Sequence, residues 1–236
     1  KGIDEPTAYA IQDKLVAKLE QSLQTHTVGY KIACTSQVAQ DLLNTDRPAY
    51  GRLFDAWHYP SGVTLNAAAY TMRVIEPEFA FTLSQDVPPS TYDGPYDAES
   101  IRPYVANVLP SIEIVHHRLA GWDRFNVRKL IADNAIHGGW VSGTPTADWE
   151  RFDLENHEVK LYSNDQLVLT GYGHRVLEHP LNALAWLANN LPLYGRQLKA
   201  GEMVTTGVCM DVYTAEAGET IRADFGTLGE VVIHFV

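Results

Sequence analysis

Apolar and polar positions follow two periods along this chain, one typical of helices and one typical of strands. Apolar side chains recur every three or four positions in 5–24 and 180–191, which predicts amphipathic helices there. Shorter helices are expected near 37–44 and 97–106. Segments rich in β-branched and aromatic residues predict strands, and they lie at 28–36, 74–83, 109–118, 140–143, 159–162, 167–169, 203–206, 219–224 and 230–235. Proline and glycine predict loops at 45–62 and 85–96.

The order of these elements indicates the fold class. The clearest helices lie at the start and near 180–191, whereas strands dominate the rest. This order predicts an α+β fold rather than alternating βαβ units. No internal repeat or linker is visible, so we expect one domain over 1–236, with a helical segment at about 1–45 and a β-rich part at about 46–236.

Composition excludes some classes of partner. The chain has 236 residues, 45% of them apolar, and a formal net charge of −11 without any Lys/Arg cluster, which argues against nucleic-acid binding. No apolar run approaches the ~20 residues of a membrane span, so no membrane partner is expected. Cys34 and Cys209 form no metal-binding pattern, and a reducing cytoplasm is the simplest setting. Because residue 1 is lysine rather than methionine, we expect native residues before it.

Three glutamates are the strongest candidates for chemistry. In V-I-E-P-E-F-A-F-T-L (74–83), strand alternation places Glu76 and Glu78 on one face, with Cα atoms roughly 6.5–7 Å apart. Taken alone, the pair is equally consistent with an exposed strand face. Glu113, however, lies within I-E-I-V, and buried carboxylates are usually paired or bound to a metal. Three carboxylates without a neighbouring cation in sequence fit a hard divalent ion such as Mg²⁺.

Several motifs in order along the chain carry a resemblance to a known family. They are G-Y-K-I-A-C-T-S (29–36), E-P-E-F-A-F (76–81), P-S-I-E-I-V (110–115), A-D-N-A (132–135), H-P-L-N-A-L-A-W-L-A-N (179–189) and D-F-G-T-L-G (224–229). The chain resembles the 2-keto-4-pentenoate hydratase and 4-oxalocrotonate decarboxylase family of the fumarylacetoacetate hydrolase superfamily. The resemblance implies a mixed β-roll with peripheral helices, a homo-oligomer, and an Mg²⁺ or Mn²⁺ site at Glu76, Glu78 and Glu113.

The resemblance also implies a reaction, a lyase step on a small 2-oxo acid or 2-hydroxy-dienoate from aromatic compound catabolism. The metal would act as a Lewis acid and stabilise an enolate. Hydration of a 2-hydroxypenta-2,4-dienoate-like substrate is the leading expectation. Decarboxylation of an oxalocrotonate-like acid, hydrolysis of an acylpyruvate C–C bond, and a non-catalytic small-acid-binding protein are the alternatives.

Lys31 is the family-matched residue for proton transfer. It lies between Tyr30 and Ile32 in an apolar strand, where burial would lower its pKa and suit it to acid or base chemistry. The alternative is a lysine that reaches the surface. The resemblance further implies substrate contacts, and we expect them at Thr35, Asp133, Asn134, Thr206 and Gly207. Asp133 and Asn134 are also candidates for a helix cap.

The chain departs from the family at three places. Ala49, in R-P-A-Y-G, stands where hydratases usually carry an aspartate that acts with the lysine. His117 follows the strand of Glu113, and a regular strand would place it on the face of Glu113, which makes it our second catalytic candidate. Val208 and Met210 replace hydroxyl residues, which indicates a more hydrophobic substrate end. His137, in A-I-H-G-G, is expected to be structural rather than catalytic.

Overall fold

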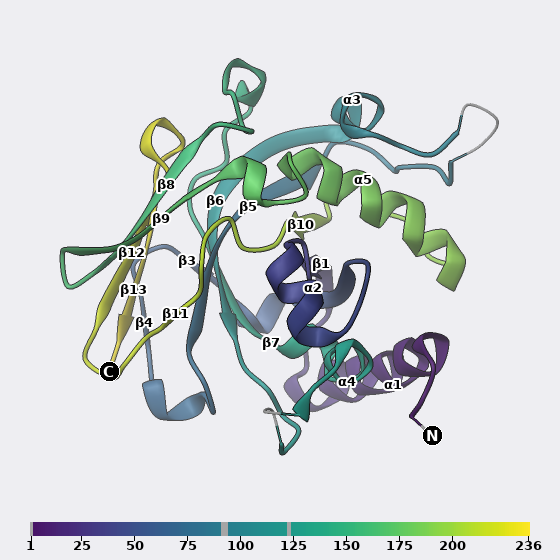
Figure 1. Cartoon of the computed structure of the whole chain (residues 1–236), viewed down its shortest axis with the longest axis horizontal. Helices are drawn as coiled ribbons and strands as arrows, with labels where there is room; N and C mark the ends of the chain where they lie inside the picture. The colour runs from purple at the N-terminus through teal and green to yellow at the C-terminus, as the bar shows by residue number, and fades with distance from the viewer. Residues whose placement is uncertain (1, 91–93, 122–123) are drawn as a thin grey trace.

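The computed structural model describes residues 2–90, 94–121 and 124–236 (Figure 1). Helix α1 (Glu5–Leu23) begins after Asp4, whose side chain accepts a hydrogen bond from the Thr7 amide, and it ends where Gln24 turns left-handed. The other α-helices are α2 (Gln37–Leu43), α3 (Ala98–Ile101), α4 (Val127–Ala132) and α5 (Pro180–Asn190). The predicted helices at 5–24, 37–44 and 180–191 are confirmed. The segment at 97–106 is only one turn of α-helix, followed by a 3₁₀ turn.

Two mixed sheets form the β part of the described chain. The larger has the order β2-β1-β10-β5-β6-β7-β3, with β11 also paired to β5. The bounds of its strands are β1 (Thr27–Ala33), β2 (Ala49–Phe54), β3 (His58–Pro60), β5 (Val74–Leu83), β6 (Val105–Val115), β7 (His137–Ser142), β10 (Met203–Thr205) and β11 (Tyr213–Thr214). The smaller sheet has the order β4-β13-β12-β8-β9. Its strands are β4 (Val63–Leu65), β8 (Glu158–Ser163), β9 (Gln166–Tyr172), β12 (Thr220–Asp224) and β13 (Glu230–Phe235).

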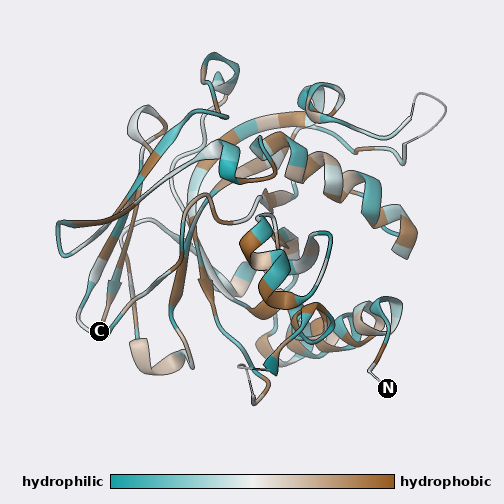
Figure 2. Ribbon diagram, viewed as in Figure 1, coloured by the Kyte–Doolittle hydropathy of each residue, from teal (hydrophilic) through white to brown (hydrophobic). Residues whose placement is uncertain are grey.

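The layers place β5 and β6 at the centre of the molecule. Figure 1 shows the smaller sheet on one side, α1, α4 and α5 on the other, and α2 in front of the larger sheet between them. A cluster of buried apolar side chains runs from α1 to β13 and includes Ala8, Phe79, Leu184 and Phe235. Hydrophobic residues accordingly colour much of β5 and β6 and parts of the helices in Figure 2. Among the described helices, none is long and apolar enough to cross a membrane.

Three parts of the sequence interpretation need correction or comment. The segment 45–62 is not a loop, because β2 and β3 lie within it. Pro48 precedes β2, and Gly51 lies inside it at a point where another backbone packs closely, so neither residue interrupts the strand. The strand expected at 109–118 is shifted, since β6 ends at Val115. The loop expected at 85–96 includes residues 91–93, which lie outside the described residues.

Candidate metal and substrate site

The pairing of β5 with β6 brings the three glutamates together. Glu76 lies directly opposite Glu113, and Glu78 lies opposite Ser111. Residues directly opposite in an antiparallel pair have side chains on the same face, and Glu76 and Glu78 share that face by alternation. A carboxylate oxygen from each of the three glutamates lies within 4.8 Å of the other two. The predicted convergence is therefore present, and binding of a cation stays a prediction.

The state of Glu78 indicates that this cluster fits a cation. Glu78 is fully buried, its Oε2 accepts a hydrogen bond from the Gly207 amide at 2.9 Å, and its Oε1 has no hydrogen-bond partner among the described residues. Burial, followed by the charges of Glu113 and Glu76, raises the pKa of Glu78. Burial likewise raises the pKa of Glu76 to about 7. A divalent ion would relieve both the desolvation and the mutual repulsion, and carboxylate oxygens are the ligands that Mg²⁺ prefers.

Gly207 can approach Glu78 only because it lacks a side chain. Its φ is +95°, and a Cβ there would lie 2.0 Å from the Thr35 hydroxyl. A side chain at this position would therefore push the amide away from the carboxylate or displace Thr35. Gly207 is predicted from the resemblance as a substrate contact, and the structure gives it a contact with a metal-ligand candidate.

Lys31 lies on the same face through an intermediate strand. It pairs with Thr205 of β10, which in turn pairs with Ala80 of β5. Its Nζ lies 2.8 Å from Glu113 Oε2 and donates a hydrogen bond to the carbonyl of Ala135 at 3.2 Å. The interpretation as a surface lysine is excluded, because the residue is 1% exposed.

The expected depression of the Lys31 pKa is wrong for this arrangement. Burial lowers the pKa of the ammonium, but the charges of Glu113, Glu76 and Glu78 outweigh it and raise the pKa above its usual value. Lys31 therefore compensates part of the negative charge of the cluster. The same contact, together with His137, holds the pKa of Glu113 below its usual value against the opposing effect of burial.

A strained turn aims the Ala135 carbonyl at Lys31. The 3₁₀ segment η5 (Asn134–Ile136) has positive φ at three consecutive non-glycine residues, 54°, 48° and 52°. Such angles are uncommon, and for a β-branched residue such as Ile136 they are costly. The Asn134 side chain holds the turn, because it accepts from the Arg52 amide at 2.7 Å and donates to the Arg52 carbonyl at 2.9 Å. Gly51 permits the close packing, since a Cβ there would lie 2.5 Å from the Asn134 carbonyl.

His137, rather than His117, is the histidine beside Glu113. It is fully buried at the start of β7, with Nδ1 3.1 Å from Glu113 Oε1 and Nε2 lacking a hydrogen-bond partner among the described residues. Burial lowers its pKa, which favours a neutral ring whose Nδ1–H donates to the carboxylate. The sequence did not identify His137 as a partner of Glu113, because their contact depends on the pairing of β6 with β7, which no local sequence pattern reveals.

The placement expected for His117 is wrong. The regular strand ends at Val115, so alternation does not extend to His117. Its Nδ1 lies 2.9 Å from the Leu119 carbonyl, and its ring packs near Phe125. It is not among the described residues that line the cavity beside Glu76.

The remaining predicted substrate contacts divide into two groups. Thr35 and Gly207 line the cavity. Thr206, Asp133 and Asn134 are not among its described lining residues: the Thr206 hydroxyl donates to the Phe79 carbonyl, and Asp133 binds the Arg118 side chain at 2.8 Å. Asp133 does stand at helix ends, as the C-cap of α4 and the N-cap of η5, but its side chain makes no capping hydrogen bond, and Asn134 lies within η5.

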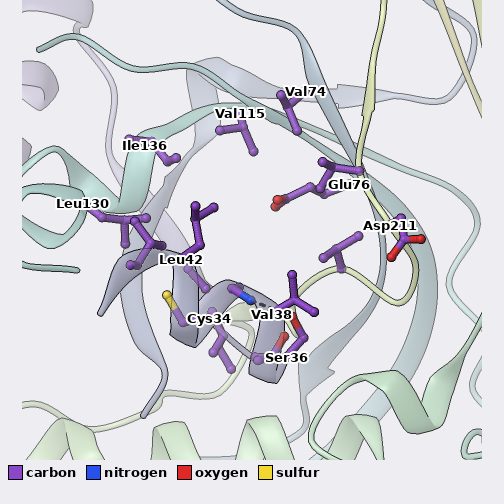
Figure 3. Close-up of a pocket in the computed structure, with 18 of the residues that line it drawn as sticks. Cys34, Ser36, Val38, Leu42, Val74, Glu76, Val115, Leu130, Ile136 and Asp211 are labelled. Carbon is purple, nitrogen blue, oxygen red and sulfur yellow. Dashed lines mark hydrogen bonds between the residues drawn. The ribbon is translucent and has the colours of Figure 1, made fainter. Parts of the chain in front are cut away.

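A cavity of about 510 Å³ opens onto Glu76 and Lys31. Figure 3 shows the Glu76 carboxylate pointing into it, with Leu42, Leu130 and Ile136 on the opposite side. Its apolar lining comes chiefly from the end of β1, from α2 and from the segment after β10, with single residues from β5, β6, α4 and η5. The lining therefore combines a carboxylate and ammonium on one side with hydrocarbon on the other, which suits a small organic acid with an apolar part.

Comparisons with known proteins identify chains that are similar to this one over most of its length. The chain is 33% identical to a 2-hydroxyhexa-2,4-dienoate hydratase from Comamonas testosteroni, over 92% of this chain and 81% of the relative. It is 31% identical to a 2-keto-4-pentenoate hydratase from Paraburkholderia xenovorans, over 97% and 82%. The solved structure of 4-oxalocrotonate decarboxylase from Pseudomonas putida G7, complexed with magnesium and adipate, superposes with a TM-score of 0.91 at 25% identity, covering 99% of this chain and 87% of that one. No protein-family model matches the chain.

Proposed function

Because this chain belongs to the 2-keto-4-pentenoate hydratase and 4-oxalocrotonate decarboxylase family of the fumarylacetoacetate hydrolase superfamily, we propose that it is a divalent-metal-dependent lyase. Its leading reaction is the hydration of a 2-hydroxypenta-2,4-dienoate-like acid from aromatic compound catabolism. The observation that carries the proposal is the convergence of Glu76, Glu78 and Glu113 on one face beside a cavity.

Each residue of the site has a separate role in this proposal. Glu76, Glu78 and Glu113 would hold Mg²⁺ or Mn²⁺, which supplies a Lewis acid for the oxygens of a 2-oxo acid or its enol. Lys31 Nζ would give a proton to the substrate carbon chain or accept one from it, and its contact with Glu113 and its position in the cavity lining support this role. His137 orients Glu113 through its Nδ1–H. Hydrogen bonds of this kind fix the position and basicity of a metal ligand.

Decarboxylation is the second candidate, and Ala49 is the observation that favours it. Ala49 is fully buried and offers no carboxylate to act with Lys31. Loss of CO₂ needs no base that activates water, whereas hydration does. The likeness in fold to a solved oxalocrotonate decarboxylase is compatible with this alternative.

The test is turnover of 2-hydroxypenta-2,4-dienoate and of oxalocrotonate with added Mg²⁺ or Mn²⁺. We expect activity in the wild type, its loss after chelation, and weaker metal binding with lower activity in Glu76→Gln, Glu78→Gln and Glu113→Gln. Glu99→Gln is the control, because Glu99 is exposed and does not belong to the glutamate cluster. Metal binding without turnover of any 2-oxo acid or dienoate would favour the non-catalytic alternative.

Two further expectations belong to this proposal. The resemblance to the family supports a homo-oligomer and a cytoplasmic location. Light scattering of the purified protein tests the first, and the location of a tagged full-length protein in cells tests the second.

A further inference from the structure

The cavity wall opposite Glu76 is hydrocarbon. Leu42 comes from α2, Leu130 from α4 and Ile136 from the strained turn, and all three face the Glu76 side across the cavity (Figure 3). Val74 and Val115 line the cavity between Ile136 and Glu76. Within the described lining, charged side chains occur only at Lys31, Glu76, Arg175 and Asp211.

Both cations of this lining already have an anionic partner. Lys31 pairs with Glu113, and Arg175 pairs with Asp211 at 2.6 Å. A second carboxylate on the substrate, placed against Leu130, Ile136 and Val115, which are at most 5% exposed, would lose its hydration there without gaining a cation from the described lining. Such a desolvated charge is strongly disfavoured.

Helix α2 contributes apolar side chains that line the cavity and are also exposed to water. Val38 and Leu42 are each 73% exposed, although both line the cavity. An apolar group bound there would cover part of this surface, and removing hydrocarbon from water is favourable. The apolar wall is therefore suited to the tail of a substrate whose acid end lies at Glu76 and Lys31.

We propose that the substrate of this chain is a monoacid with an apolar tail, such as a 2-hydroxydienoate extended by an alkyl group, and that Leu42, Leu130 and Ile136 select it against diacids. This inference rests on the proposed function and adds the substrate class to it. The comparisons do not decide the point, because the related chain at 33% identity is named for a monoacid whereas the similar structure at 25% holds the diacid adipate.

The first test compares kcat/KM over a series of 2-hydroxydienoates in the presence of Mg²⁺. Each methylene added to the tail should raise kcat/KM about fourfold until the wall is covered, which corresponds to ~0.8 kcal/mol for each buried CH₂. A diacid of the same chain length should be at least about tenfold poorer, because its second carboxylate is desolvated without a partner. A diacid hydrated as well as the matched monoacid would overturn the proposal.

Leu42→Lys tests the wall directly. The exposure of Leu42 lets a lysine be accommodated, and its ammonium should raise the ratio of diacid to monoacid kcat/KM about tenfold. Leu193→Lys is the matched control, since Leu193 is also 73% exposed and is not among the described lining residues. An unchanged ratio in Leu42→Lys, or a change of oligomeric state without a change of ratio, would show that α2 does not bind the tail.

Arg175→Gln separates the apolar wall from Arg175. The substitution removes the paired arginine and leaves the wall intact, so the ratio of monoacid to diacid kcat/KM should stay near that of the wild type. A fall in kcat/KM for the diacid alone would show that Arg175 reads the far end of the substrate, and the proposal would be wrong.

Binding of unreactive acids keeps the inference separate from the proposed function. Calorimetry with Mg²⁺ should show 2-oxohexanoate binding at least about tenfold more tightly than 2-oxohexanedioate. That preference without hydration of any dienoate would contradict the proposed function and support the substrate class. Hydration of a dienoate together with equal binding of the two acids would support the proposed function and contradict the substrate class. Failure of both acids to bind would contradict the proposed function and the substrate class alike.

Discussion

Lys31 and Glu113 form a buried ion pair, with Nζ and Oε2 2.8 Å apart, within the cluster that also contains Glu76 and Glu78. The residue proposed for proton transfer is therefore in direct contact with a residue proposed to bind metal. A cation at the cluster and the ammonium of Lys31 would both interact with the Glu113 carboxylate. Variants of either residue must accordingly be judged by metal affinity and by turnover together.

Lys31→Met should separate these two properties. Methionine keeps most of the side-chain volume but carries no proton, so turnover should fall roughly 10²–10⁴-fold. Affinity for Mg²⁺ should stay the same or increase, because the ammonium no longer competes for Glu113. Initial rates and calorimetric titration measure the two effects, with the exposed Lys14→Met as the control. Parallel losses of affinity and turnover would instead indicate that Lys31 is structural.

His137 should matter more than His117. His137→Leu removes the hydrogen bond to Glu113, and Mg²⁺ affinity should fall roughly 10–100-fold, as expected when the partner of a metal ligand is lost. His137→Asn should recover part of the affinity, since its amide can donate to the same oxygen. His117→Leu should leave metal affinity near that of the wild type. If His117→Leu were the more damaging change, our assignment of His137 would be wrong.

Asn134 should position Lys31 through the strained turn. Asn134→Ala removes two hydrogen bonds to the Arg52 backbone and should lower stability by about 1–3 kcal/mol. It should also lower kcat, because the Ala135 carbonyl is released from Lys31. Asn164→Ala is the control: Asn164 also has a positive φ and accepts from a backbone amide, that of Thr220, in the turn between β8 and β9.

The comparison of these two asparagines distinguishes positioning from stability. Chemical denaturation measures the stability of both variants, and steady-state kinetics measures kcat. We expect a smaller loss of stability for Asn164→Ala, because Asn164 is exposed and accepts one hydrogen bond, and a fall in kcat only for Asn134→Ala. Equal effects on kcat, or none in either variant, would show that the turn does not position the lysine.

Ala49→Asp should distinguish hydration from decarboxylation. Ala49 pairs with Ala33 and Gly51 pairs with Lys31, so the side chain of residue 49 lies on the face of Lys31. In a hydratase the added carboxylate should increase hydration of 2-hydroxypentadienoate. In a decarboxylase it should leave CO₂ release unchanged or reduce it, because it adds negative charge to the site. Ala49→Asn, of similar volume without the charge, is the control for both assays.

The chelator-treated protein should lose stability as the pH rises from about 4.5 towards about 7. Burial raises the pKa of Glu76 from 4.5 to about 7, so over this range the folded protein keeps a proton that the unfolded chain has released. Buried histidines such as His137, whose pKa is lowered, act in the opposite direction. The measurement is therefore the difference in melting temperature between Glu76→Gln and wild type, which should grow with pH. A constant difference would contradict the raised pKa.

Local periodicity alone determined much of the secondary structure. Apolar side chains every three or four residues located α1 and α5, and alternation within 74–83 located β5 and placed Glu76 and Glu78 on one face. These features depend on neighbours along the chain, so they can be read from the sequence. The apolar neighbours of Glu113 added it to the pair as a buried carboxylate, and the resemblance to the family extended this reading to Lys31.

Only the tertiary structure decided which residues complete the site. The register of β5 with β6 set Glu76 opposite Glu113, and β10 placed Lys31 beside them. The end of β6 at Val115 removed His117 from the predicted face, and the pairing with β7 brought His137 to Glu113. Register and strand ends depend on the burial and hydrogen bonding of the whole sheet rather than on neighbouring residues. For this reason the sequence indicated the chemistry of the glutamate cluster but not the residues that surround it.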